Sequence, residues 1–348
     1  MSNLQVGLAV VGGLVLAIMV AHGAWTSRRN LPRQATLPDA AGTPDAGQQA
    51  GAAVEPELDA AAFDVASFPV AAAEKKPALD ALIDVIASIA LDAPVSGEAA
   101  LAAMPPTRRA GGKSFSIEGF NEVSQRWEIP LPGQRYGMFQ AGVQLANRSG
   151  ALNDIEYSEF VMKTQVFCDA INGTPDFPEM RNEVARAREL DQFASEHDAQ
   201  LGFVLRARNA AWSPGYVQQN ASRLGFVAGS IPGRMVIPAS LPGLPPVLVL
   251  SFDAQAAMAD DPAQSAIREL AISLDVAQVD RGERAFGRMR DAARSLAEGM
   301  DGVVTDDNGM LLSVAAMELI GSELEQLYDT LEQHDLSAGS GAARRLFS

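Results

Sequence analysis

The feature that most constrains this chain is an apolar stretch near its start. Residues 6–25 read VGLAVVGGLVLAIMVAHGAW, and no charged side chain precedes Arg28. At a rise of about 1.5 Å per residue, roughly 20 such residues cross the ~30 Å hydrocarbon layer of a membrane. A buried helix of a soluble protein would carry a polar stripe, and this stretch has none. The rest of the chain is therefore either tethered to a membrane or exported across one.

The residues that flank this stretch distinguish an anchor from a cleaved signal peptide. A signal peptide carries a basic segment before its apolar core, whereas here Arg28 and Arg29 follow the core. The positive-inside rule keeps this flank in the cytoplasm, with Trp25 at the membrane interface. We predict an uncleaved, single-pass transmembrane anchor over residues 1–27, entered at Val6, with the N-terminus outside and the body cytoplasmic. The alternative is an exported envelope protein, such as a hydrolase, whose signal has been removed.

Composition narrows the possible functions. The 348 residues carry a formal net charge of -16, which argues against nucleic acid as the main partner. The single cysteine, Cys168, excludes an intramolecular disulfide and a cysteine-cluster metal site, and its amphipathic surroundings favour a buried core thiol. Three scattered histidines leave little material for a zinc site or a catalytic triad. We therefore expect no catalytic residue, no metal and no cofactor, and we do not predict an enzyme.

A long segment rich in alanine, proline and acidic residues follows the apolar stretch. Residues 28–112 contain few aromatic side chains, so they cannot bury enough apolar surface to offset the entropy of ordering them. We predict a disordered acidic linker. A short helix is predicted within it at 77–92, because Leu79, Ile83 and Ile86 fall on one helical face. That helix would either dock on the following domain or bind a partner.

Hydrophobic periodicity predicts an α+β fold after the linker. Apolar and polar residues alternate, as in strands with one buried face, in three segments: 138–146, 201–208 and 270–276. Apolar residues recur at steps of three and four, as in helices, in four segments: 157–171, 178–197, 286–300 and 317–331. Ser213 and Pro214 suit a helix start, and Asp280 and Glu283 have the spacing of a capping box. The expected domain is an antiparallel sheet with helices on one face.

These elements predict a division of the chain. We expect an additional α/β subdomain over 113–198, a second domain over 199–336 and a flexible tail over 337–348. The two parts echo each other faintly, because each runs from a strand through a helix to a helix that ends in His-Asp, at His197 and at His334. Alternating helices and strands produce such echoes readily, so this repeat alone is weak evidence of duplication.

Three arginines suggest a binding surface in this otherwise acidic protein. Arg206 and Arg208 alternate with Leu205 along one predicted strand, so they would point to the face that helices leave uncovered. Arg234 lies beside another predicted strand. One interpretation is an electropositive, partly apolar groove for an acidic and apolar peptide. The other is a surface that only keeps the domain soluble.

Three segments of the chain resemble the ZipA family of bacterial cell-division proteins. HGAWTSRR at 22–29 is similar to the end of that family's membrane anchor. LAEGMDGVVTDDNGML at 296–311 is similar to the last helix–hairpin block of the family's C-terminal domain, and Gly225-Phe226 also fits. The order of anchor, linker and domain is the same in the family.

The resemblance implies both a fold and a role. It implies a split β-α-β domain, with an antiparallel sheet and helices on one face, whose exposed face binds the C-terminal tail of the tubulin-like protein FtsZ. It also implies a non-enzymatic protein of the cell inner membrane that tethers FtsZ filaments, and so stabilises the septal ring, at the division site. Other division proteins are possible partners.

The resemblance also implies the positions of the peptide contacts. Ile231 falls where the family has an apolar contact and Ser273 where it has an aromatic ring. Phe252 or Ala254 would supply the neighbouring apolar contact. Together with the arginines above and Val204 of the strand at 201–208, the predicted FtsZ-peptide site consists of Val204, Arg206, Arg208, Ile231, Arg234, Phe252 and Ser273. A further alternative is a membrane scaffold that binds a different partner through residues 113–198.

Overall fold

The computed structural model describes residues 32–35, 79–259 and 265–348. The chain divides into two compact units, one formed by Met1–Thr36 and Asp191–Ser348 and the other by Leu37–Leu190. We call them the C-terminal unit and the N-terminal unit, and each is described by itself. Among the described residues, no helix has the length and apolar character needed to cross a membrane. The predicted anchor, with Val6, Trp25, Arg28 and Arg29, lies outside the described residues.

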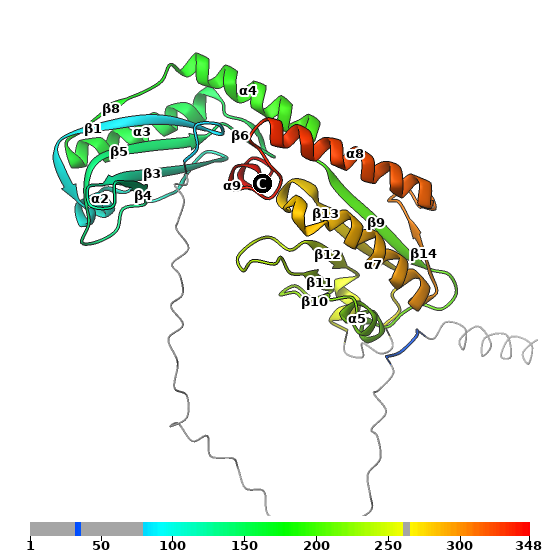
Figure 1. The fold of residues 1–348 in the computed structure, drawn as a ribbon. Helices are drawn as coiled ribbons and strands as arrows, with labels where there is room; N and C mark the ends of the chain where they lie inside the picture. The colour runs from blue at the N-terminus through cyan, green and yellow to red at the C-terminus, as the bar shows by residue number, and fades with distance from the viewer. Residues whose placement is uncertain (1–31, 36–78, 260–264) are drawn as a thin grey trace, which may run out of the picture. The chain divides into compact units, whose positions relative to one another are not determined.

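The N-terminal unit is an antiparallel sheet with helices on one face (Figure 1). Its strands run in the order β2-β3-β5-β1-β8, with β4 paired to β3. The strands are β1 (Asp84–Ser96), β2 (Arg109–Ala110), β3 (Lys113–Asn121), β4 (Arg126–Glu128), β5 (Arg135–Gln144) and β8 (Gly173–Asp176). A separate small ribbon joins β6 (Ala146–Asn147) to β7 (Gly150–Ala151). The helices are α2 (Gly97–Ala103), α3 (Asp154–Ile171) and α4 (Met180–His197).

The core of the N-terminal unit lies between this sheet and its helices. Phe139 of β5 contacts Phe167 of α3 edge to face, with ring centroids 5.3 Å apart, and both rings are buried. Helix α3 begins at a capping box: the Asn153 side chain accepts from the Glu156 N–H, and the Glu156 side chain accepts from the Asn153 N–H. Cys168 is buried among these residues, which confirms the predicted core thiol. Burial raises the pKa of this thiol to about 11, so it is protonated near neutral pH.

The C-terminal unit repeats this one-sided arrangement (Figure 1). Its strand order is β10-β11-β12-β13-β9-β14, and every pair is antiparallel. The strands are β9 (Gln200–Ala207), β10 (Val227–Ala228), β11 (Arg234–Ile237), β12 (Leu248–Ser251), β13 (Glu269–Asp275) and β14 (Gly302–Thr305). The α-helices are α5 (Pro214–Ser222), α6 (Ala254–Ala257), α7 (Ala285–Met300), α8 (Val314–Gln333) and α9 (Gly341–Leu346). Two short 3-10 turns, η1 (Val276–Gln278) and η2 (Arg281–Glu283), precede α7.

Strict alternation separates the two faces of this second sheet. Phe203 and Leu205 of β9 and Ile272 of β13 are buried, and α7 packs against both strands. The residues that alternate with these, such as Val204 and Ala271, point to the opposite face, where they lie side by side and are only half-buried. We call this opposite side the open face. The α+β class with antiparallel sheets is confirmed.

A short segment within the predicted linker is part of the C-terminal unit. Arg33 donates its backbone N–H to the carbonyl of Ala211 (2.7 Å), and its own carbonyl accepts from the N–H of Ser213 (2.9 Å). The Arg33 guanidinium also pairs with Asp301 at 3.0 Å. Arg33 therefore extends a small sheet in which Trp212 pairs with Ile267. The prediction that residues 28–112 form a disordered linker throughout is wrong at this point.

The other end of the predicted linker also differs from expectation. Residues 84–96 form strand β1, not part of a short helix at 77–92, and β1 pairs with both β5 and β8. The segment is ambiguous because Val85, Ala87 and Ile89 share one strand face, while Leu79, Ile83 and Ile86 share one helical face. Hydrogen bonding to β5 and β8 on either side makes this segment a strand and not a helix. Ordered elements therefore begin before residue 113, and the unit boundary falls inside α4.

The predicted flexible tail at 337–348 is a helix packed on the domain. Ser340 caps α9, and Leu346 and Phe347 are buried. The Gln278 side-chain amide donates to the carbonyls of Arg344 (3.1 Å) and Phe347 (2.7 Å). The small residues of this tail predicted flexibility, but hydrogen bonds from η1, far away in the sequence, hold the tail in place.

Candidate peptide-binding groove

A groove of about 610 Å³ crosses the open face of the C-terminal unit. Its floor comes from alternate residues of two paired strands, Val249 of β12 and Ala271 and Ser273 of β13. The proline-rich loop before β12 contributes Pro246, and the turn after β14 contributes Asp307. Because β9 carries Gly202 on this face, the Asp307 carboxylate lies close to the strand: a Cβ on Gly202 would be 3.1 Å from its Oδ1. The groove therefore has a small-residue floor between loop walls.

A second hollow of about 360 Å³ continues the groove. It lies between the turn before β11 and the proline-rich loop, and it shares Arg234 and Pro246 with the first hollow. Ile231 and Leu241 are 53% and 65% exposed on its walls. We call the two hollows together the face groove. It is apolar at this end, has the Arg234 guanidinium near its middle and carries the Asp275 and Asp307 carboxylates at the other end. This arrangement suits an extended peptide with apolar side chains and one acidic group placed at Arg234.

The loop that walls the face groove is held by a carboxylate near the start of α7. The backbone N–H of Ser240 donates to Glu283 Oε1 at 2.9 Å, and Arg288 donates to Glu283 Oε2 at 2.9 Å. Hydrogen bonds from the side chain and then the backbone of Ser240 are the main reasons that the pKa of Glu283 lies below its usual value. The predicted capping box is wrong, because Glu283 bonds this loop and Asp280 accepts from Gly282 within a 3-10 turn.

The structure separates two of the predicted basic contacts from the groove. Arg206 lies on the open face of β9, but its Nε is 3.3 Å from the Glu269 carboxylate, so its charge is balanced within the sheet. Arg208 follows the end of β9 and lines a different pocket. Strand alternation no longer sets the direction of a side chain beyond Ala207, so the argument that placed Arg206 and Arg208 on one face does not extend to Arg208.

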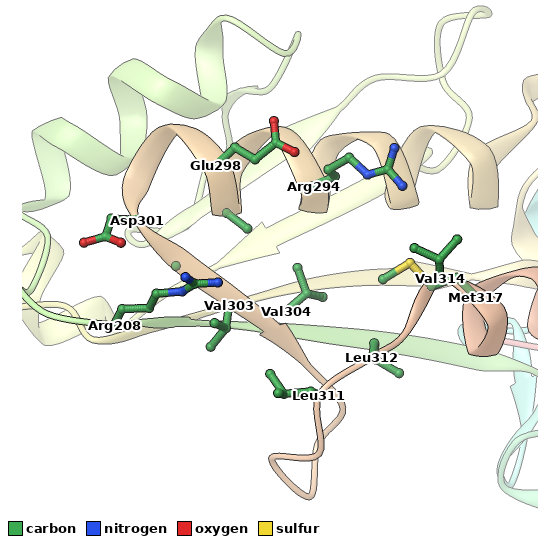
Figure 2. A pocket seen from close by; sticks show the side chains of 12 residues that line it. Arg208, Arg294, Glu298, Asp301, Val303, Val304, Leu311, Leu312, Val314 and Met317 are labelled. Carbon is green, nitrogen blue, oxygen red and sulfur yellow. The ribbon is translucent and has the colours of Figure 1, made fainter.

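The pocket that Arg208 lines lies at the edge of the sheet, beside β14. It encloses about 500 Å³ (Figure 2). Figure 2 shows Arg294 and Glu298 projecting from α7 above it, with Leu311 and Leu312 on the turn below β14. We call it the edge pocket. It contains two arginines and two carboxylates, Glu298 and Asp301, so no single charge dominates it.

The remaining predicted contacts have different positions. Ile231, Arg234 and Ser273 line the face groove, which brings together residues from three separate segments. Val204 lies on the open face and pairs with Ala271, a groove residue. Phe252 is only 9% exposed, so its ring does not offer a surface for a peptide, contrary to the prediction.

Sequence reasoning missed several residues of the groove. Ala271 and Asp275 have the same strand parity as Ser273, so the alternation of β13 alone could have placed them on the open face. Pro246 and Asp307 lie in loops, where no periodicity signals a direction. Among the described residues, no group of three or more histidine, cysteine, aspartate or glutamate side chains could hold a metal ion.

A one-sided antiparallel sheet with a shallow groove on its free face defines an α+β domain suited to binding an extended peptide. Residues 254–323 match the family described as ZipA, C-terminal FtsZ-binding domain. The match confirms the resemblance to ZipA over this segment. It runs from α6 into α8 and includes β13, the strand that supplies Ala271 and Ser273 to the face groove. A comparison with curated proteins found no match.

Proposed function

We propose that this protein binds the C-terminal tail of FtsZ in the face groove and tethers FtsZ filaments to the inner membrane at the division site. The observation that carries the proposal is that two features occur on the same strand, β13. This strand lies within the segment that matches an FtsZ-binding family, and its outward residues form the floor of the groove. The tail would lie along the groove with apolar side chains toward Ile231 and an acidic group at Arg234.

The docked segment at Arg33 bears on how the tether works. If residues 6–25 cross the membrane as predicted, the chain between Trp25 and Pro32 spans at most roughly 25 Å when fully extended. Because Arg33 is bonded to the C-terminal unit, that unit is held beside the membrane surface instead of at the end of a long linker. FtsZ filaments would therefore be captured close to the lipid headgroups.

Binding of a single tail need not be tight for such a tether. Many anchored copies that engage one filament raise the effective concentration of each further contact. Modest single-site affinity then gives firm attachment while it allows each tail to exchange.

The test uses the full chain in uncharged detergent micelles and a fluorescein-labelled peptide with the sequence of the FtsZ C-terminal tail. Fluorescence anisotropy should show saturable binding, because the groove is open on the free face of the sheet. Arg234→Glu should weaken binding about tenfold, since one charge-assisted contact is lost and a repulsive one gained. Arg208→Glu makes the same charge change in the edge pocket and serves as the matched control.

Three outcomes would contradict this proposal. Absence of saturable binding would remove FtsZ as the partner. A loss of binding in Arg208→Glu without a loss in Arg234→Glu would place the tail in the edge pocket instead. An intact mass that lacks the first residues of the chain would favour the exported alternative over the anchor.

A further inference from the structure

The two units of this chain share one topology. Each begins with a central strand, β1 or β9, followed by a short helix, and each later runs from a strand through a long helix to an edge strand and a final helix. The strand order β3-β5-β1-β8 of the N-terminal unit corresponds to β12-β13-β9-β14 of the C-terminal unit. All of these pairs are antiparallel in both units.

The correspondence extends to single residues. Helices α3 and α7 both end at a left-handed residue, Asn172 (φ 53°) and Asp301 (φ 56°), and a glycine then opens the edge strand. Counted back from these ends, the inward residues occupy the same positions: Ile171, Phe167, Thr164, Phe160 and Tyr157 in α3, and Met300, Leu296, Ala293, Met289 and Phe286 in α7. At the ends of α4 and α8, His197 and His334 each bond the carbonyl four residues earlier.

The N-terminal unit is therefore a second copy of the fold that carries the face groove. The faint repeat in the sequence is a duplication of the whole domain, including strands that show no resemblance in sequence. Aligning Gly173 with Gly302 fixes the register of every paired strand, and this alignment allows the two open faces to be compared position by position.

The open face of the N-terminal unit carries aromatic and apolar residues where that of the C-terminal unit carries charged ones. The Arg206–Glu269 pair of the C-terminal unit corresponds to Ala90 and Met138, which lie opposite each other on β1 and β5. Met138 pairs in turn with Phe120, which pairs with Trp127. The rings of Phe120 and Trp127 meet edge to face with centroids 5.4 Å apart. We call these four residues, Ala90, Met138, Phe120 and Trp127, the aromatic row; Met138 is 43% exposed in it.

Part of this open face is covered by the chain itself. Gly142 corresponds to Ser273 of the face groove, and the Leu79 side chain covers it so closely that a Cβ on Gly142 would be 2.4 Å from Leu79 Cδ2. The Leu79 N–H donates to the buried Glu118 carboxylate at 3.3 Å. The aromatic row lies outside the part that Leu79 covers, and Met138 within it is exposed.

Acidic side chains flank the aromatic row. Asp176 is exposed on β8 and pairs with Ser88, the residue beside Ala90 on the same face of β1. Glu122 is exposed at the other side, where its Oε1 would be 3.6 Å from a Cβ on Gly137, the neighbour of Met138. An apolar surface between two carboxylates is complementary to an apolar segment that carries basic residues.

We propose that the N-terminal unit uses its aromatic row to bind a second ligand, an extended apolar peptide segment with lysine or arginine side chains. Its apolar side chains pack on Trp127, Phe120 and Met138, and its basic groups pair with Asp176 and Glu122. This site is chemically distinct from the face groove, where Arg234 favours an acidic group. The protein would then join FtsZ to a partner of opposite charge character.

The test measures binding of a fluorescein-labelled probe, the hexapeptide Lys-Val-Lys-Phe-Lys-Val with blocked ends, to the full chain in uncharged detergent micelles. We expect saturable binding that Trp127→Ala with Met138→Ala weakens at least tenfold, because buried aromatic anchors dominate such interfaces. Trp127→Phe with native Met138 should retain most of the affinity and shows that the fold tolerates change there. Val123→Ala, at an 85% exposed apolar position outside the row, is the matched control.

The outcomes separate this proposal from the proposed FtsZ site. Arg234→Glu should leave probe binding unchanged, and the double variant should leave binding of the FtsZ tail unchanged. Equal affinity for a peptide with glutamate in place of each lysine would overturn the charge complementarity. Probe binding that the double variant does not alter would overturn the site itself.

Discussion

The docked segment at Arg33 allows a quantitative prediction for the variant Arg33→Glu. In the native protein, the Arg33 guanidinium pairs with Asp301 at 3.0 Å, and both side chains are about one third exposed (37% and 33%). Such a pair contributes about 0.5–1 kcal/mol, discounted here for solvent screening. The introduced carboxylate would instead repel Asp301 by about 1 kcal/mol at a separation near 4 Å in water. The docked state should lose about 1.5–2 kcal/mol, which lowers its equilibrium constant roughly 10- to 30-fold.

Amide hydrogen exchange of single residues measures this loss. The Arg33 N–H donates to Ala211, and the Ser213 N–H donates to Arg33, so both amides should exchange roughly 10- to 30-fold faster in Arg33→Glu. The Trp212 N–H donates to Ile267 instead and provides an internal control within the same strand. Gln34→Glu, at an exposed neighbouring position, is the control for added negative charge. Unchanged protection of Ser213 in Arg33→Glu would refute the argument that this ion pair holds the segment.

Three further predictions concern the cores and the groove wall. Trp212 is fully buried, and its indole N–H donates to the Met300 carbonyl at 2.8 Å. Trp212→Phe should therefore lower the free energy of unfolding, measured by urea titration, by about 2–3 kcal/mol. A change under about 0.5 kcal/mol would contradict this prediction. Cys168 has a raised pKa of about 11 and is buried, so iodoacetamide should label it in denatured but not in native protein near pH 8; rapid native labelling would show that the thiol is accessible. The pKa of Glu283 is lowered by its bond to Ser240, so this contribution to stability is complete above the ordinary value of 4.5 and is lost as pH falls through the lower folded value. The Ser240 amide resonance should therefore shift in acid, and Glu283→Gln should abolish that shift.

Local rules of the sequence predicted much of the C-terminal unit. The alternation in 201–208 and 270–276 recurs in β9 and β13, with Phe203 and Ile272 buried as expected. Ser213 caps α5 with Pro214 as its first residue, because an N-cap bond spans only three residues and depends little on the rest of the fold. The capping box at Asp280 failed because Ser240, over forty positions away in the sequence, supplied a better partner for Glu283.

The candidate groove could be predicted only in part. The parity of β13 is sufficient to place Ser273 on the open face, and Ile231 and Arg234 also reached the groove. Arg208 and Phe252 did not, because each lies just beyond the end of its strand, where alternation no longer applies. The groove walls come from loops whose positions depend on bonds such as that between Ser240 and Glu283.

The sequence by itself determined what depends on neighbouring residues: the faces of individual strands and helices, the helix caps, the α+β class and the resemblance to the ZipA family. The tertiary structure decided what depends on distant partners. It made residues 84–96 a strand between β5 and β8, attached Arg33 to Asp301 and packed α9 against η1. It also turned the faint repeat of the sequence into a repeated fold, because strand order and register are shared by the two units while the side chains on their open faces differ. The physical reason is that hydrogen bonds between strands specify register without regard to the side chains that the strands carry.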